Sequence, residues 1–201
     1  MHSTISLDQG LLIAEGSERR CYAHPQLNDR CLKVPLDRTL GRLCPQCRVE
    51  MITSVNMQKR LVPMQHAVRS YGWVDTSMGP ALMMEKVQDK HGKISLTLEQ
   101  SLKAGNLTWN QVKTMLQTLR DWALEYSVVI SELNVKNLMH CRGESGDRLV
   151  VIDGLGGRKP DLVFHLRQRL LWMARHKTRK RWPREYEKIR KASLNIIKGL
   201  V

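Results

Sequence analysis

The sequence predicts a small α+β protein with two lobes, and this prediction rests on a change of hydrophobic period along the chain. Residues 1–87 contain short apolar segments separated by turn residues, which is typical of an antiparallel sheet. From about residue 95 the apolar residues recur at helical spacing, so residues 88–201 are expected to form a mostly helical second lobe. A chain of 201 residues, 42% of them hydrophobic, is long enough to bury a sizeable core.

The first lobe is expected to hold one antiparallel sheet and one helix. Alternation within residues 30–34 places Cys31 and Lys33 on the same face of a half-buried strand. Residues 47–61 have helical spacing, and Glu50 lies near the start of this helix. Its rough apolar stripe consists of Val49, Ile52, Val55 and Met57. The five strands are expected at residues 11–14, 20–24, 30–34, 66–75 and 80–87.

The second lobe is expected to be built from helices around one short hairpin. Helices are predicted at residues 97–103 and 108–126, and Thr108 is a suitable N-cap for the second. The apolar stripe of that helix consists of Val112, Met115, Leu116, Leu119, Trp122 and Ala123. The apolar segments 138–141 and 148–152 are joined by a turn at Gly143–Asp147, and the last forty or so residues are expected to be helical.

The charge of the chain is strongly positive and is concentrated at its C-terminus. The formal net charge is +14, and residues 158–201 hold 14 of the 33 Lys and Arg residues against three acidic residues. Such a segment attracts phosphates on a nucleotide, a nucleic acid, a lipopolysaccharide or an anionic membrane. Charge alone does not choose among these partners, so an anionic acceptor substrate, a membrane surface and a nucleic acid all stay open at this point.

The composition also bears on where the protein works. No apolar run approaches the roughly 20 residues of a membrane span, and Met1–Thr4 does not begin a signal peptide. The five cysteines are an odd number, which fits a reducing compartment. The sequence thus predicts a cytoplasmic protein without a transmembrane segment, with the basic end available to the inner membrane surface.

Three polar residues occur in the order and spacing of a kinase-type phosphoryl-transfer site. Glu132 precedes Asn137 by five positions, and Asp153 follows an apolar strand on a glycine-flanked turn. Kinase-type sites place a base and two Mg²⁺ ligands in this order. Asn137 and Asp153 are the expected metal ligands because Mg²⁺ prefers oxygen donors, and Glu132 is the candidate base or hydroxyl-positioning group. The expected cofactors are ATP and Mg²⁺.

Residues of the first lobe are expected to complete this site. Lys33 would contact the phosphates of ATP, and Glu50 would hold the Lys33 amine. The turn at Gly16 would cover the phosphates, but it is poor in glycine, so nucleotide binding is expected to be either weaker or assisted by an arginine. Residues 83–87 fall where backbone groups would bind adenine. The cofactor contacts expected in this lobe are Gly16, Ser17, Lys33, Glu85 and Val87.

Several stretches of the chain resemble the PhoP regulatory network protein YrbL family. They are Arg20–Pro25, Asp29–Val34, Asp89–Lys93 and the segment from Asn137 to Asp153. This bacterial family is similar to the protein-kinase-like fold and to small lipopolysaccharide core kinases, which phosphorylate sugars. The resemblance spans roughly residues 10–160. It implies a protein-kinase-like fold and a sugar or glycolipid hydroxyl as the phosphate acceptor.

Two other functions remain open. The glycine-poor phosphate loop, and a glutamate where protein kinases carry an aspartate base, are compatible with a pseudokinase-like regulator that binds nucleotide without transfer. The basic run Arg175–Trp182 is compatible with a nucleic-acid-binding protein in which Trp182 and Tyr186 stack on bases. The short second lobe leaves little room for a peptide-docking platform, which disfavours a protein substrate.

The cysteine pattern raises one further alternative. Cys44 and Cys47 form a CxxC pair, and Cys21, Cys31 and His24 could supply further ligands to a structural zinc ion. A second pair at matching spacing is missing from the sequence. Two ordinary reduced thiols at the start of a helix therefore compete with the zinc interpretation.

Overall fold

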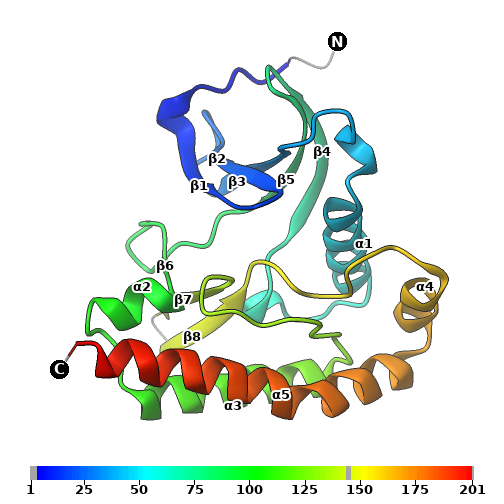
Figure 1. Cartoon of the computed structure of the whole chain (residues 1–201). Coiled ribbons are helices and arrows are strands. Elements are labelled where there is room, and N and C mark those ends of the chain that lie inside the picture. Colours follow the sequence, from blue (N-terminus) through cyan, green and yellow to red (C-terminus); the bar gives the residue numbers. More distant parts are fainter. Residues whose placement is uncertain (1–3, 144–145, 201) are drawn as a thin grey trace.

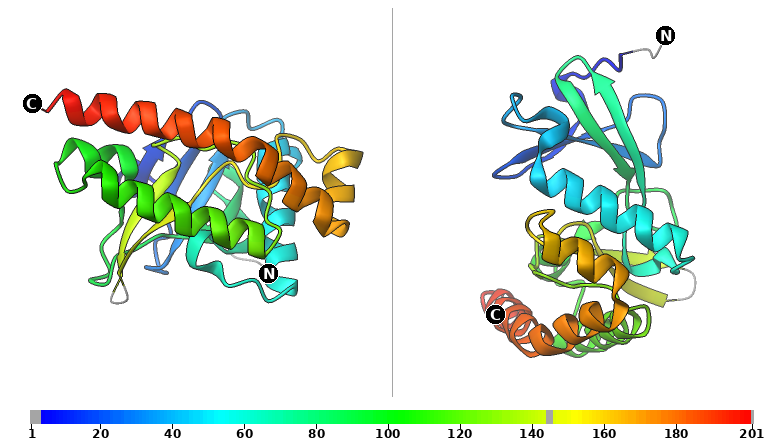
Figure 2. Two further views of the ribbon diagram at one scale, coloured as in Figure 1. Left: turned by 90° about the horizontal axis from the view of Figure 1, so that it is seen from below. Right: turned by 90° about the vertical axis from the view of Figure 1, so that its right-hand side faces the viewer.

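The computed structural model describes residues 4–143 and 146–200 and confirms a two-lobed α+β fold (Figure 1). The first lobe contains a five-stranded antiparallel sheet with strand order β1-β2-β3-β5-β4. Its strands are β1 (Leu12–Glu15), β2 (Arg19–Ala23), β3 (Arg30–Pro35), β4 (Ser70–Thr76) and β5 (Gly79–Glu85). Helix α1 (Pro45–Lys59) follows β3 and packs between this sheet and the second lobe (Figure 2).

The second lobe combines a small sheet with four helices in the described part of the chain. Its strands β6 (Leu96–Thr97), β7 (Leu138–Gly143) and β8 (Gly146–Val151) pair in that order. Its helices are α2 (Leu98–Lys103), α3 (Trp109–Glu125), α4 (Leu162–Arg169) and α5 (Leu171–Lys198). Helices α3 and α5 lie side by side under the small sheet (Figures 1 and 2).

The long helix α3 matches its sequence prediction closely. Thr108 caps its N-terminus by accepting a hydrogen bond from the Gln111 N–H. The Gln111 side chain accepts one from the Thr108 N–H, which completes a capping box. The six residues of the predicted apolar stripe are its buried residues. They belong to the largest core cluster, together with residues of α2, β8 and α5. An amphipathic helix with one wide apolar face is therefore enough to fix this side of the lobe.

Helix α1 buries Val49 and Met57 of the predicted stripe, but the other two residues of the stripe are not buried. The sequence placed Ile52 and Val55 on the apolar side, but both are only half-buried. The buried face instead includes Glu50, Thr53 and Ser54. Ser54 donates a hydrogen bond to the Val68 carbonyl and accepts one from the Ser70 N–H. Hydrophobic spacing failed here because polar side chains on this face have partners in other segments.

The strand predicted at residues 66–75 begins only at Ser70. Its expected first residue, His66, lies in a 3₁₀ turn, Met64–His66, that follows Pro63. The His66 ring nitrogen bonds the Leu149 carbonyl of β8 at 2.7 Å, and Ala67 forms a bridge with Val151. This segment therefore contacts the second lobe rather than extending the first sheet.

Other expected boundaries shift by a few residues or fall outside the described chain. The C-terminal helices occupy the expected region as α4 and α5. The turn expected at Gly143–Asp147 includes residues 144–145, which lie outside the described residues, as do residues 1–3 of the expected N-terminus. The lobe boundary expected between residues 87 and 88 stays a prediction. None of the described helices combines the length and hydropathy needed to cross a membrane.

Candidate functional site

The site is centred on a buried ion pair between the first sheet and α1. Strand β3 carries Lys33, and the Lys33 Nζ atom lies 2.8 Å from Glu50 Oε2. The same amine donates to the Ile152 carbonyl at 2.8 Å, just beyond β8 in the second lobe. Lys33 and Glu50 are 9% and 7% exposed. One amine thus connects the first sheet, the helix and the second lobe.

The ion pair keeps both partners charged despite their burial. Burial alone would raise the pKa of Glu50, but the charges of Lys33 and Arg19 lower it to about 2. Burial would lower the pKa of Lys33, yet the Glu50 carboxylate raises it overall. A protonated amine is therefore held in a fixed position, as an electrostatic contact with phosphate oxygens would require.

Asp153 lies next to this pair on a turn that requires glycine. Gly154 has φ +95°, and a Cβ atom at this position would lie 2.0 Å from the Glu132 carbonyl oxygen. The Ser131 N–H donates to the Gly154 carbonyl at 2.9 Å, so the two segments are in backbone contact. Burial and the nearby Glu50 carboxylate raise the pKa of Asp153, against the charges of Lys33 and Arg19.

Arg19 is the residue of this site that the sequence prediction missed. Its Nη2 atom lies 2.8 Å from Glu50 Oε1 and 2.9 Å from Asp153 Oδ2. Burial would lower the pKa of Arg19, but Glu50 raises it, so the guanidinium stays charged. The alternation of side chains along a strand could have identified Arg19. It is two positions before Cys21, which pairs with Lys33, so both side chains lie on the face of the sheet that carries Lys33. The prediction of a strand starting at residue 20 left Arg19 in the turn.

The two residues expected from the loop before β7 lie alongside the Asp153 turn, with different side-chain surroundings. The Asn137 carbonyl accepts the Ile152 N–H at 3.0 Å, which puts Asn137 beside the residue before Asp153. The Glu132 carboxylate lies 3.3 Å from both Arg158 and Lys188. Burial would raise the pKa of Glu132, but these two cations lower it. A carboxylate with lowered pKa suits positioning of a hydroxyl better than removal of its proton.

The predicted cofactor contacts of the first lobe are spread along its sheet. Gly16 and Ser17 are exposed in the turn between β1 and β2, where the Gly16 N–H bonds the Arg19 carbonyl. Glu85 ends β5, and its carboxylate lies 3.3 Å from Arg69. The Val87 carbonyl accepts the Ser95 N–H at 3.0 Å. The adenine contacts assigned to Glu85 and Val87 stay predictions.

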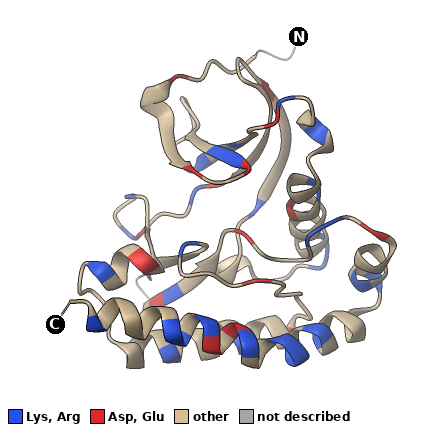
Figure 3. Ribbon diagram, viewed as in Figure 1, with Lys and Arg blue, Asp and Glu red and all other residues tan. Residues whose placement is uncertain are grey.

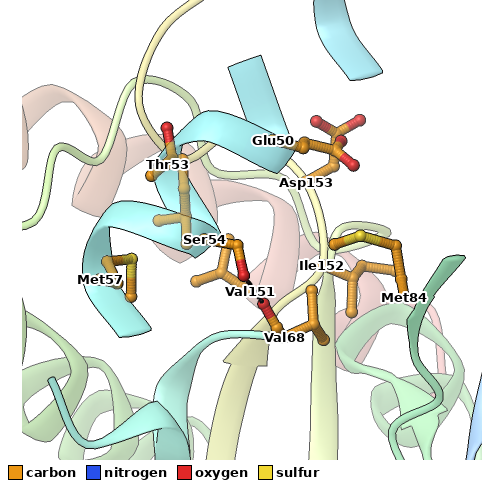
Figure 4. Close-up of a pocket in the computed structure, with 10 residues that line it drawn as sticks. Glu50, Thr53, Ser54, Met57, Val68, Met84, Val151, Ile152 and Asp153 are labelled. Carbon is orange, nitrogen blue, oxygen red and sulfur yellow. Dashed lines mark hydrogen bonds between the residues drawn. The ribbon is translucent and has the colours of Figure 1, made fainter. Parts of the chain in front are cut away.

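A small pocket opens behind the ion pair. Glu50 and Asp153 lie at one edge of it, and the other walls are mainly apolar residues such as Met57, Val68 and Val151 (Figure 4). Its cavity of about 20 Å³ has room for roughly one water molecule. This space is far too small for a nucleotide, so it is a gap in the packing of α1 against the Asp153 turn.

The Asp153 carboxylate suits Mg²⁺ if phosphate oxygens and water supply most of the coordination. Glu50 Oε1 is buried and has no aligned hydrogen-bond donor among the described residues. The described chain also contains no group of three or more His, Cys, Asp or Glu side chains arranged around a metal position. Mg²⁺ is commonly held by one or two carboxylates together with substrate phosphates. Asp153 could serve in this way once Arg19 releases it, whereas the Asn137 contact with this turn is made by its backbone carbonyl and the role of its amide stays a prediction.

The cysteines of the zinc interpretation do not form a metal site in the described part of the chain. Cys44 caps the start of α1, and Cys21, Cys31, Cys44 and Cys47 are free thiols. Cys31, Cys44 and Cys47 are buried in the core cluster between the sheet and α1. Within residues 4–143 and 146–200, these cysteines are not part of any group of three or more His, Cys, Asp or Glu side chains that could hold a metal ion.

The fold and the site define a two-lobed α+β protein with a buried Lys–Glu pair beside an Asp-Gly turn where the lobes meet. The model of the family described as PhoP regulatory network protein YrbL matches residues 5–191, and the chain belongs to this family. The Uncharacterized protein YrbL of Escherichia coli (strain K12) is 27% identical over 155 residues, covering 76% of this chain and 73% of that protein. The protein of the same name from Shigella flexneri matches with the same identity and coverage.

Proposed function

We propose that this protein is an ATP- and Mg²⁺-dependent phosphotransferase that acts on a hydroxyl group of a sugar or glycolipid. The observation that carries the proposal is the buried contact of Lys33 with Glu50 and with the Ile152 carbonyl, directly beside Asp153. Residues far apart in the sequence thereby place the Lys33 amine beside the Asp153 carboxylate, which is a suitable metal ligand, between the two lobes. Phosphoryl transfer needs such positioned charges more than it needs covalent chemistry.

Each residue of the site has a distinct part in the proposed reaction. Lys33 would bind non-bridging phosphate oxygens, and Glu50 holds the amine in place. Asp153 and Asn137 would hold Mg²⁺, which supplies neutralisation of the phosphate charge. Glu132 would position the acceptor hydroxyl, whose oxygen attacks the terminal phosphorus while ADP leaves and the hydroxyl proton is released.

Arg19 adds a requirement to this scheme. Its Nη2 atom lies 2.9 Å from Asp153 Oδ2, so a Mg²⁺ ion bound to that oxygen would compete with the guanidinium for the same position. Binding of Mg²⁺ with nucleotide therefore needs Arg19 to turn away from Asp153. In its new position Arg19 would pair with phosphate oxygens, which supplies the arginine expected for a glycine-poor phosphate loop.

Replacement of Asp153 by Asn tests the metal assignment. We expect Mg²⁺-dependent release of ADP to fall by about a hundredfold or more, because several kcal/mol of metal stabilisation are lost. The measurement is ADP release with sugar and glycolipid acceptors, with and without Mg²⁺. Asp121→Asn removes an exposed carboxylate of α3 and serves as the control. Wild-type ADP release from the Asp153→Asn protein would show that the metal ligand is misassigned.

A regulator that binds nucleotide without transfer is the second candidate function. Two observations favour it. Arg19 forms an ion pair with Asp153, and the Glu132 carboxylate forms ion pairs with Arg158 and Lys188. The description of the family as part of a regulatory network agrees with this role. Nucleotide titration separates the two functions. Binding that is unchanged without Mg²⁺, and that yields no ADP with any acceptor, would favour the regulator.

A further inference from the structure

Helix α5 holds the loop that carries Glu132 through a row of buried contacts. Thr178 Oγ1 accepts the Ile130 N–H at 3.1 Å, and Arg181 Nη1 donates to the Ser131 carbonyl at 2.6 Å. One turn further, Glu185 accepts the Leu133 N–H at 2.9 Å. The side of α5 that faces this loop is therefore fixed against the candidate transfer site.

Lys177 and Arg181 on this side of α5 both contact Ser131, and neither forms an ion pair with a described carboxylate. Lys177 Nζ lies 3.3 Å from Ser131 Oγ, a neutral hydroxyl. Burial and the charges of Arg167 and Arg181 lower the pKa of Lys177 to about 8, and only Asp161 opposes this. Within residues 4–143 and 146–200, no carboxylate lies within ion-pair distance of Lys177, Arg167 or Arg181.

Two further cations extend this group toward Glu132. Arg158 and Lys188 each lie 3.3 Å from the Glu132 carboxylate, and the Arg158 side chain is 81% exposed. Figure 3 shows Lys and Arg positions repeated along α5 beneath the loop. The charges of Arg167 and Arg181 disfavour a proton on Lys177, so binding of an anion at this place would be strengthened by the relief of their repulsion.

We propose that Arg167, Lys177 and Arg181 form a subsite for a phosphate monoester on the acceptor substrate. The subsite rests on the proposed function, because it lies beside the loop where the acceptor hydroxyl would be held. Ser131 contacts Lys177 and Arg181 through its hydroxyl and carbonyl, and its N–H bonds Gly154, the residue after Asp153. A phosphate bound here would orient the acceptor through charge-assisted hydrogen bonds.

The acceptor phosphate could belong to a soluble sugar phosphate or to a lipid head group. Binding of glucose 6-phosphate, measured by calorimetry at about 0.15 M salt, reports the soluble source. Cosedimentation with phosphatidylcholine vesicles, with and without phosphatidic acid, reports the lipid source. Phosphatidic acid is chosen because its head group is itself a phosphate monoester.

The test variant is Arg167→Gln with Lys177→Gln, since neither residue holds a backbone group of the loop. We expect the affinity for the bound probe to fall roughly tenfold or more, the equivalent of about 1.4 kcal/mol. Arg179→Gln with Lys180→Gln removes the same charge from exposed positions of α5 and should change the affinity less than about twofold. Arg181→Gln should also lower the affinity for the probe, and thermal unfolding shows whether this variant is folded.

The titration of Lys177 gives an independent readout. A bound phosphate favours the charged amine, so affinity for the probe should fall as the pH rises above 8 in the wild type. The Lys177→Gln protein should lack this dependence. Equal losses of probe affinity in both double variants would mean that the probe is held by diffuse charge attraction, which would overturn the subsite. A wild-type protein that binds neither probe would overturn it as well.

These outcomes separate the subsite from the proposed function. Probe binding is measured without nucleotide, so it does not depend on phosphoryl transfer. Loss of ADP release in Asp153→Asn with normal probe binding would leave the subsite intact. Active ADP release with no effect of the Arg167 and Lys177 substitutions would remove the subsite and keep the phosphotransferase.

Discussion

The buried charges of Glu50, Lys33 and Arg19 show how single residues gain their properties from distant partners. Glu50 is buried, yet two cations hold its pKa at about 2. A buried ion pair costs much desolvation, so losing one partner leaves the others poorly compensated. The order of Lys33 and Glu50 in the sequence predicted their contact, because a strand lysine followed by a helix glutamate is typical of kinase-type sites. Arg19 could be recognised only from its position beside them.

Replacement of Glu50 by Gln should strongly destabilise the protein. We expect a loss of about 3 kcal/mol or more in the free energy of unfolding, because Lys33 and Arg19 keep their buried charges. Urea unfolding at pH 7 measures this loss. Glu187→Gln, which breaks an exposed pair with Arg190, should change the stability by less than about 1 kcal/mol.

The contribution of Glu50 to the free energy of unfolding should depend on pH. The pKa of Glu50 is about 2 in the folded protein and 4.5 ordinarily, so its ionised form stabilises the fold above pH 4.5. This contribution is lost as the pH falls toward 2. The stability difference between wild type and Glu50→Gln should therefore narrow across that range. A difference that stays constant with pH would contradict the ion-pair explanation.

Among the elements, α5 has the least expected position in the fold. Its basic composition predicted attraction of phosphates, but one side of it forms hydrogen bonds with the backbone of the loop at residues 130–133. Thr178 is 1% exposed and bonds both the Ile130 N–H and the Val128 carbonyl. Spacing alone predicted the buried side of α3, because there the partners are all apolar. On α1 and α5 the buried polar residues hide the pattern.

Replacement of Thr178 by Val should loosen the loop that carries Glu132. The substitution keeps the shape of the side chain but leaves a buried N–H and a buried carbonyl without a partner, at a cost of about 1–3 kcal/mol. We expect faster hydrogen exchange of the amides from Ile130 to Leu133. Thr114→Val on the exposed side of α3 is the matched control. Unchanged exchange would mean that α5 does not hold the loop.

At the scale of the whole molecule, the net charge of +14 is carried mainly by the second lobe. Most of the excess lies within residues 158–201, which include α4 and α5. Long-range attraction of polyanions should therefore be a property of this lobe and not of the site between the lobes. This separation makes the nucleic-acid alternative testable.

Binding to duplex DNA should be weak, steeply dependent on salt and insensitive to the Asp153→Asn substitution. Each Lys or Arg that contacts phosphate contributes about one unit to the slope of log affinity against log salt. Neutralising Arg179 and Lys180 should reduce this slope, as measured by fluorescence anisotropy over a salt series. Tight binding that persists at physiological salt would support the nucleic-acid-binding function instead.

The sequence by itself determined the α+β class, the strands of the first sheet, the buried face of α3 and the basic C-terminal helices. These features depend on short-range period and composition, which can be read along the chain. Only the tertiary structure decided that Arg19 contacts Asp153, that polar residues of α1 are buried, and that Glu132 lies between Arg158 and Lys188. The reason is physical: a polar or charged side chain is buried only where partners from distant segments compensate it, and no local pattern records those partners.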